Sequence, residues 1–132
     1  MNGFAIVKSD PNLKPLAGNS DTIALTLTFL DDFGPALIWG RLGLGNVDGD
    51  AQNAAAWLVW QRDFTNEPTE QLDRVEVRLG GIDDAAQMSV SLQGWIVARK
   101  GQMIELHCAT YSGSGREASL IALGIEEFRI SP

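Results

Sequence analysis

The segment "VSLQGWIVARKGQMIELHC", residues 90–108, decides the fold class, because it joins two alternating runs through a short stretch of turn residues. Apolar residues occupy every second position over 88–92 and again over 104–108. A period of two is typical of a half-buried β-strand, whose side chains point alternately to opposite faces. Between the runs, Lys100-Gly101 suits a tight hairpin in which the glycine adopts a positive φ. The segment therefore predicts antiparallel β-structure.

The same two-residue period recurs elsewhere along the chain. It is present in "TIALTLTF" (22–29) and in "LDRVEVRL" (72–79), where charged residues alternate with valine and leucine. Gly80-Gly81 and "SGSG" (112–115) have the composition of turns. Several short strands separated by turns, with almost no helical signal, predict an all-β fold. We expect an antiparallel two-sheet sandwich of the jelly-roll type.

Three segments depart from this simple pattern. Residues 1–21 contain proline, glycine and asparagine, and we expect an N-terminal arm or edge strand there. Residues 50–64 carry consecutive alanines that favour a helix but also "WLVW", and we prefer a strand. At Gly94 the alternation passes from even to odd positions, which predicts a bulge or corner. Such a bulge would turn the following Trp95 ring toward the outer surface.

Size, cysteine content and charge narrow the class of protein. A chain of 132 residues is expected to form a single domain over 1–132, large enough to hold a core without a disulfide or a metal. Cys108 is the only cysteine, so no disulfide can form within the chain. The formal net charge is -7, and the longest basic cluster is Arg99-Lys100. This balance argues against binding to nucleic acid and to anionic membranes.

The sequence shows no membrane or targeting segment. No stretch approaches the roughly 20 apolar residues that cross a bilayer, so we expect no membrane insertion. The first residues lack the basic start and the long apolar run of a signal peptide. We therefore expect a chain that is cytoplasmic when made, with later release or association with a particle left open.

Three runs are apolar at consecutive positions, so that both faces of those strands are apolar. They are "ALIW" (36–39), "WLVW" (57–60) and "LIAL" (120–123). A lone two-sheet sandwich shelters only one face of each sheet. The outer side chains would expose on the order of 500 Å², which is the size of the largest apolar patch on a typical monomer. We expect a homo-oligomer, the alternative being that residues 1–21 fold over this surface.

The stretch from Val90 to Ile130 resembles the last three strands of the jelly rolls of tumour necrosis factor and of the complement globular heads. It contains an apolar strand, a hairpin with lysine and glycine, an alternating strand, a glycine-rich loop and the apolar run "ASLIALGIEEFRI" (118–130). It is also similar to the small trimeric tips and lectins of bacteria and phage-like particles. The chain lacks the aromatic-glycine-aromatic signature of the complement heads. The resemblance implies a homotrimer that binds ligands at loops or between protomers, and it assigns no site residue.

The glycine-rich stretch "GRLGLGNVDGD" (40–50) could bind phosphate or calcium, or it could be a turn. Its glycines are spaced one residue too far apart for a dinucleotide fingerprint, and the lysine of a P-loop is missing. Asn46, Asp48 and Asp50 alternate as calcium ligands do, but Trp57 stands where an EF-hand places its bidentate glutamate. We interpret the stretch as an inter-strand loop. Calcium bound by Asp48 and Asp50 remains an alternative, and no other cofactor is expected.

The sequence contains no recognisable set of residues for nucleophilic catalysis. His107 and Cys108 are the only histidine and the only thiol, and adjacent strand residues point to opposite faces, so they cannot form a dyad. We expect Cys108 in the core and His107 as a solvated surface residue. "YSGSG" (111–115) does not match a nucleophile elbow. The chain is therefore predicted not to be an enzyme, and a metal-assisted hydrolase built on Asp48 and Asp50 is the minor alternative.

Four tryptophans remain to be explained, as ligand platforms, interface residues or core. Sugars present flat C–H faces to aromatic rings, while polar side chains bind their hydroxyls. We predict a non-catalytic oligomeric binding module, an attachment tip for a carbohydrate or another cell-surface ligand. The main alternative is a structural subunit, such as a capsid or fibre decoration, without a small ligand. The candidate ligand-binding residues are Trp95, Asn46, Asp48, Asp50, His107 and Arg116.

Overall fold

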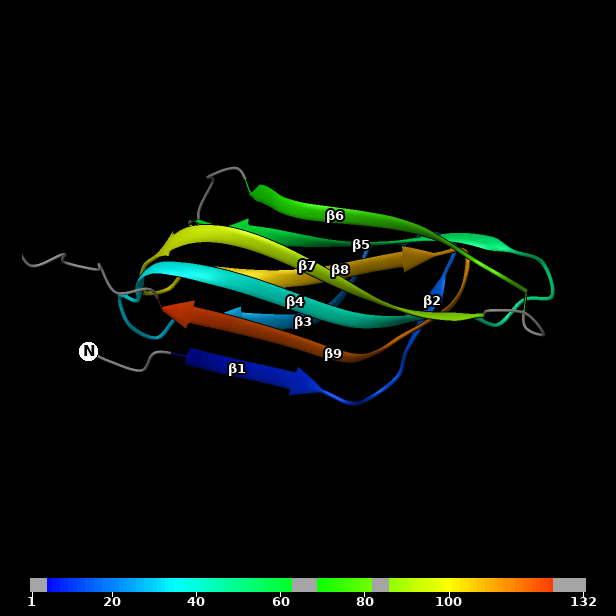
Figure 1. Cartoon of the computed structure of the whole chain (residues 1–132), viewed down its shortest axis with the longest axis horizontal. Coiled ribbons are helices and arrows are strands. Elements are labelled where there is room, and N and C mark those ends of the chain that lie inside the picture. Colours follow the sequence, from blue (N-terminus) through cyan, green and yellow to red (C-terminus); the bar gives the residue numbers. More distant parts are fainter. Residues whose placement is uncertain (1–4, 63–68, 82–85, 125–132) are drawn as a thin grey trace, which may run out of the picture.

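The computed structural model describes residues 5–62, 69–81 and 86–124, and all regular structure within them is β-strand (Figure 1). Among these residues, no helix exists that could cross a membrane. The strands are β1 (Ala5–Asp10), β2 (Lys14–Ala17), β3 (Thr22–Thr28), β4 (Gly34–Asn46), β5 (Gln52–Gln61), β6 (Glu70–Leu79), β7 (Gln87–Ala98), β8 (Met103–Thr110) and β9 (Ser112–Gly124).

These strands form two antiparallel sheets packed face to face (Figure 1). Sheet A has the order β1–β9–β4–β7, with β2 also paired to β9, and sheet B has the order β3–β8–β5–β6. Most consecutive strands lie in opposite sheets, so that the chain winds around the sandwich rather than folding into local hairpins. This is the connectivity of a jelly roll. The predicted all-β sandwich of jelly-roll type is confirmed.

The connection at 99–102 is a turn between sheets, so the predicted hairpin is wrong. β7 lies in sheet A and β8 in sheet B. Gly101 has the expected positive φ of 90°, and its N–H donates to the Phe29 carbonyl over 2.7 Å at the end of β3. Turn residues look alike whether they reverse the chain within one sheet or carry it across to another. The positive φ predicted for Gly101 is therefore confirmed, while the predicted pairing of the strands on either side of the turn is wrong.

The core lies between the two sheets and is made of aliphatic side chains from both. Leu42, Leu92 and Leu120 of sheet A and Leu58 and Leu106 of sheet B have no exposed surface. Each buried side chain of this kind stabilises the fold by about 1.5–3 kcal/mol relative to an exposed one. Within the segment at 50–64, the preferred strand is confirmed as β5 over Gln52–Gln61, and residues 63–64 lie outside the described part of the chain.

Two glycine-rich stretches expected to be loops are largely strands. Residues 40–46 belong to β4, and 112–115 begin β9, with Gly45 opposite Ser114 in the register of these strands. A Cβ added at Gly113 would lie 2.0 Å from the Gly45 carbonyl oxygen. Glycine here lets two backbones approach closely, a role that composition does not distinguish from turn formation. Only 47–51 is the connecting loop between β4 and β5.

The described part of the N-terminal segment forms edge strands, which is one of the two structures predicted for it. β1 and β2 both pair antiparallel with β9, at the edge of sheet A. Neither strand lies over the outer face of the sheet in the described part of this segment, residues 5–21. The alternative in which the arm roofs the apolar surface is therefore wrong for these residues.

Gly94 is not a bulge, although its neighbour Trp95 points outward as expected. β7 pairs with β4 from Gly34 to Gly45 without a register shift, so the even positions of β7 face the core from Val90 to Ala98. A Cβ at Gly94 would lie 2.7 Å from the Cβ of Leu72 on β6. The glycine makes room for a side chain of the opposite sheet. This contact between distant segments has no local sequence signal.

Candidate functional site

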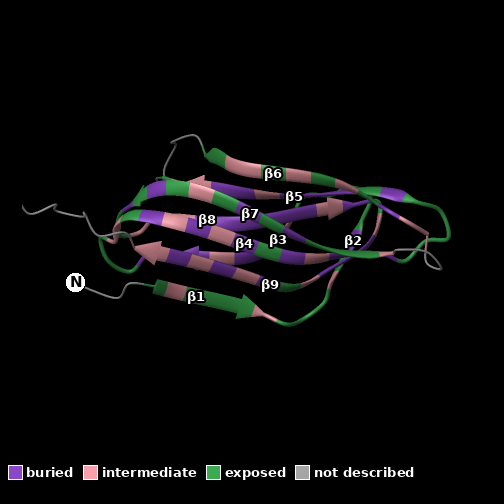
Figure 2. Cartoon of the chain, viewed as in Figure 1, coloured by how far each residue is buried: buried purple, intermediate pink, exposed green. Residues whose placement is uncertain are grey.

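The outer face of sheet A carries a continuous cluster of apolar side chains, which we call the apolar face. In the strand register Leu37 lies opposite both Trp95 and Leu123, and Trp39 lies opposite Ile121. The exposed fractions are 65% for Val7, 55% for Trp95 and 48% for Val97. Figure 2 shows exposed and buried residues alternating along β7, and β1 exposed over most of its length. The face consists of Ala5, Val7, Leu37, Trp39, Trp95, Val97, Ile121 and Leu123.

The other end of the same outer face is polar. Arg41 lies opposite Ser91 and Ser119 in the register. The Arg116 guanidinium donates a hydrogen bond to Oε1 of Gln87. Two shallow hollows of about 220 and 270 Å³ open between these side chains. Arg116 is thus placed on the same sheet as Trp95 but on its polar portion.

Asn46 organises the loop between β4 and β5. Its Nδ2 donates to the carbonyl oxygens of Asp50 and Gly80 over 2.8 and 2.9 Å. Its Oδ1 accepts from the Asp48 N–H over 2.8 Å and from Gln52 Nε2 over 2.6 Å. The side chain is only 4% exposed. These four bonds use the hydrogen-bonding capacity of the amide, so Asn46 shapes the loop rather than binding a ligand.

Asp48 and Asp50 lie in this loop and are exposed. Among the described residues, no group of three or more His, Cys, Asp or Glu side chains is arranged to hold a metal ion. A calcium site would need more oxygen ligands than these two carboxylates provide. Calcium binding and the hydrolase built on it stay predictions, without a third carboxylate in place in the described part of the chain.

His107 is buried on the outer side of sheet B, so the expectation of a solvated residue is wrong. It is 8% exposed, with Nδ1 2.5 Å from Asp21 Oδ1 and Nε2 3.1 Å from Glu105 Oε1. Its ring stacks on Trp57 with the centroids 5.4 Å apart. The pairing of β3 with β8 brings the segment of Asp21 beside His107, which strand alternation alone does not reveal.

Cys108 points into the core, on the opposite side of β8 from His107. It has no exposed surface, and burial among apolar side chains raises the pKa of its thiol to about 11. A thiol of this kind remains protonated at neutral pH and is a poor nucleophile. Its placement as a small core residue is confirmed, and so is its separation from His107.

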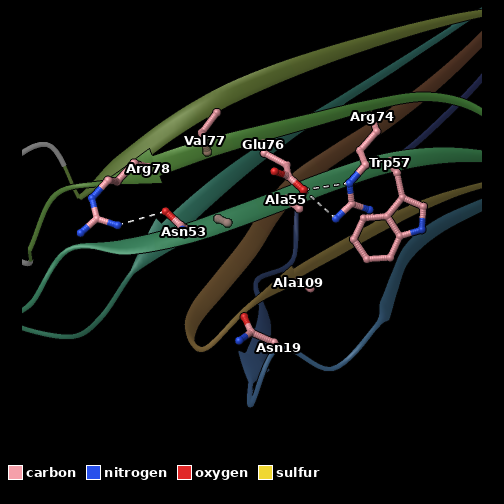
Figure 3. Close-up of a pocket in the computed structure, with 10 residues that line it drawn as sticks. Asn19, Asn53, Ala55, Trp57, Arg74, Glu76, Val77, Arg78 and Ala109 are labelled. Carbon is pink, nitrogen blue, oxygen red and sulfur yellow. Dashed lines mark hydrogen bonds and ion pairs between the residues drawn. The ribbon is translucent and has the colours of Figure 1, made fainter.

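A groove crosses the outer face of sheet B (Figure 3). It has a volume of about 530 Å³, and we call it the alanine groove because Ala55 and Ala109, which are opposite each other in the register, form its floor. Trp57 and Arg74 flank the floor on one side, as Figure 3 shows. The remaining lining residues are Asn19, Asn53, Ala54, Glu76, Val77 and Arg78.

The predicted site residues are therefore dispersed. Only Asn46, Asp48 and Asp50 come together, and His107 and Trp95 lie on opposite sheets. The alanine groove was not predicted from the sequence. Part of it could have been, because Ala55 and Trp57 are two residues apart on one strand and therefore point to the same face of the sheet. The register that sets Ala109 and Arg74 beside them is not readable from the sequence.

The fold places the chain among the jelly-roll sandwiches, a class that includes viral capsid proteins. No family model and no curated protein matches the chain. Among solved structures, this chain is similar to a protein chain in the structure of infectious bursal disease virus, Gx strain. The TM-score is 0.60, with 12% identity over 96% of this chain. It is also similar to the T13 particle of that virus, with a TM-score of 0.59 and 12% identity over 93% of this chain.

A mutant VP2 protein of infectious bursal disease virus, from derived T=1 particles, is a further structure of this kind. The TM-score is 0.54, at 12% identity over 91% of this chain. The chain spans about a third of the length of these viral proteins, 35% and 32% for the first two. At an identity this low, the structural likeness shows a shared fold alone. These three structures are all of infectious bursal disease virus, and the resemblance to the jelly rolls of tumour necrosis factor and the complement heads stays a prediction.

Proposed function

We propose that this protein is a structural subunit that assembles with copies of itself through the apolar face of sheet A. The observation that carries the proposal is the continuity of that face across β1, β9, β4 and β7, with Trp95 55% exposed near one edge. The jelly roll that it shares with viral capsid proteins supports the same conclusion. Such a subunit would belong to a capsid or would decorate a particle. The sequence resemblance implies three copies.

The size of the apolar face fits a contact between subunits. Its side chains expose on the order of 500 Å². Covering that area contributes on the order of 10 kcal/mol, against about 4–15 kcal/mol for the loss of translational and rotational freedom. A stable interface buries about 800 Å² on each partner. The polar end of the sheet, with Arg41 and Arg116, would supply the remaining area and the hydrogen bonds at its rim.

The surroundings of Trp95 favour a protein contact over a sugar platform. Its cross-strand neighbour is Leu37, and Val97 and Leu123 belong to the same face. A sugar site needs hydrogen-bonding groups close to the aromatic ring, and the apolar face supplies few of them. Recognition of a carbohydrate or of a cell-surface ligand at Trp95, as the sequence predicts, is therefore the weaker proposal for this face.

The test is the oligomeric state of the full chain by sedimentation velocity or light scattering over a range of concentrations. We expect a concentration-dependent oligomer, and we expect Trp95→Ser to raise its dissociation constant at least tenfold, because an exposed tryptophan that becomes buried at an interface contributes about 2 kcal/mol or more. Tyr111→Ser is the matched control, since Tyr111 is 63% exposed outside the apolar face. A wild-type chain that stays monomeric at high concentration would overturn the proposal.

A further inference from the structure

We propose that the alanine groove on the outer face of sheet B is a binding site for a saccharide. The groove is separate from the self-assembly surface, because sheet A and sheet B form the two layers of the sandwich and their outer faces point in opposite directions (Figure 1). A subunit could therefore assemble through one sheet and bind a ligand on the other.

The strand register explains why a groove exists here. Ala55 of β5 lies between Ala109 of β8 and Glu76 of β6, so a row of small side chains crosses part of the sheet. The next outward residues along β5 are Trp57 and Asn53, about 13 Å apart along the strand at roughly 3.3 Å per residue. Large side chains on both sides of a floor of methyl groups leave a trough that runs across the strands.

The groove has the size of a ligand site. Its volume of about 530 Å³ falls within the roughly 300–1,000 Å³ of small-molecule sites. Asn19, in the turn between β2 and β3, contributes to its lining from a distant part of the chain. Asn19 has a positive φ of 56°, a backbone conformation that asparagine adopts more readily than most other residues.

The Trp57 wall is held in place before any ligand arrives. The Arg74 guanidinium carbon lies 4.8 Å from the centroid of the Trp57 ring system, and the His107 ring stacks on the same indole. Arg74 also pairs with Glu76 at the surface, where its Nε donates to Glu76 Oε1 over 3.1 Å (Figure 3). A wall that is already ordered loses little conformational entropy when a ligand binds.

The chemistry of the walls matches a saccharide. Arg78 donates from Nη1 to Asn53 Oδ1 over 3.1 Å, and a guanidinium has five N–H groups, so others can reach into the groove. Arginine, asparagine and glutamate side chains supply both donors and acceptors, as hydroxyl groups require. The methyl groups of the alanine floor provide an apolar surface for C–H groups, while the Trp57 ring, already in contact with Arg74 and His107, forms a side wall that bounds the ligand. Glu76 and the net charge of -7 disfavour a polyanion such as nucleic acid.

The test begins with the full-length chain on a printed array of mammalian and bacterial glycans. The best free oligosaccharide is then titrated by isothermal calorimetry. Ala109→Leu fills the groove at a partly exposed position outside the core, and we expect it to weaken binding at least tenfold without changing the circular dichroism spectrum. Arg78→Gln is expected to weaken binding about tenfold, whereas Arg99→Gln, an exposed arginine in the turn after β7, should leave it unchanged.

Each outcome decides the proposal. The absence of any glycan bound by the wild-type chain, or equal binding by folded Ala109→Leu, would overturn it. Loss of binding in both Ala109→Leu and Arg78→Gln, with the control intact, would support it. The Trp95→Ser variant separates the two proposals, since it should lose self-association and still bind the same oligosaccharide with unchanged affinity.

Discussion

Buried polar side chains in this protein hold distant segments together. Asn46 bonds to the loop after β6 through the Gly80 carbonyl, and His107 lies between Asp21 and Glu105. In the described residues, every buried side-chain nitrogen or oxygen has a hydrogen-bond partner. An unpaired group in the core would cost about 1–3 kcal/mol. Asn46 and His107 were singled out from the sequence as ligand residues, and their partners in the fold instead give them structural roles.

Replacement of Asn46 by alanine should destabilise the protein by about 2–4 kcal/mol. The variant removes four hydrogen bonds and leaves buried partners such as the Gly80 carbonyl unsatisfied. Urea unfolding followed by circular dichroism measures the change. Asn53→Ala, at an exposed position with one side-chain bond to Arg78, should cost less than 1 kcal/mol. Equal losses for the two variants would contradict the role assigned to Asn46.

The thiol of Cys108 should be protected from reagents and should couple stability to high pH. Its folded-state pKa of about 11 lies above the ordinary value of 9.0. The stabilisation is therefore fully present below pH 9 and is lost as the pH rises through 11, by about 2 kcal/mol. Unfolding free energies at pH 8 and 11 should fall more for the wild type than for Cys108→Ala. Rapid alkylation of the native thiol at pH 8 would show that the thiol is accessible.

At the level of strands, period and turn chemistry predicted most of the elements but not their partners. The runs at 22–29, 72–79 and 103–108 form β3, β6 and β8, because a row of apolar side chains facing the core gives each run most of its two-residue period. The pairing of β7 with β4 rather than β8 depends on contacts between distant segments. The glycines at 40–46 and 112–115 lie in strands and not in the predicted loops. Composition alone does not distinguish a glycine that forms a turn from one that lets two strands approach closely.

Gly113→Ala should destabilise the protein strongly, by about 3 kcal/mol or more. Its new Cβ would meet the Gly45 carbonyl of the paired strand β4, and a backbone atom cannot move aside without breaking the ladder. Gly49→Ala is the control, because nothing lies within 4 Å of a Cβ there. It should change the free energy of unfolding by less than about 1 kcal/mol. A Gly113→Ala variant as stable as Gly49→Ala would disprove the close approach of β4 and β9.

For the whole molecule, the sequence predicted that apolar side chains occupy outer faces but did not place the candidate sites. The runs at 36–39 and 120–123 do meet in the apolar face of sheet A. The run at 57–60 lies in sheet B, where Trp57 is partly covered by His107 and Arg74 and lines the alanine groove. Which sheet a strand joins is decided by the winding of the whole jelly roll. The two faces therefore differ in chemistry in a way that only the folded chain shows.

Self-assembly through the apolar face should make thermal stability depend on protein concentration. Association that requires the native state stabilises it by mass action, by up to about 2.7 kcal/mol for a hundredfold rise in concentration. For a domain of this size we expect the Tm to rise by several degrees between 1 and 100 µM, on the order of 3–8 °C. Scanning calorimetry or fluorimetry measures this shift. Trp95→Ser should flatten the dependence, while Tyr111→Ser should keep it, since Tyr111 lies outside the apolar face. A wild-type Tm that is the same at both concentrations would contradict assembly by the folded chain.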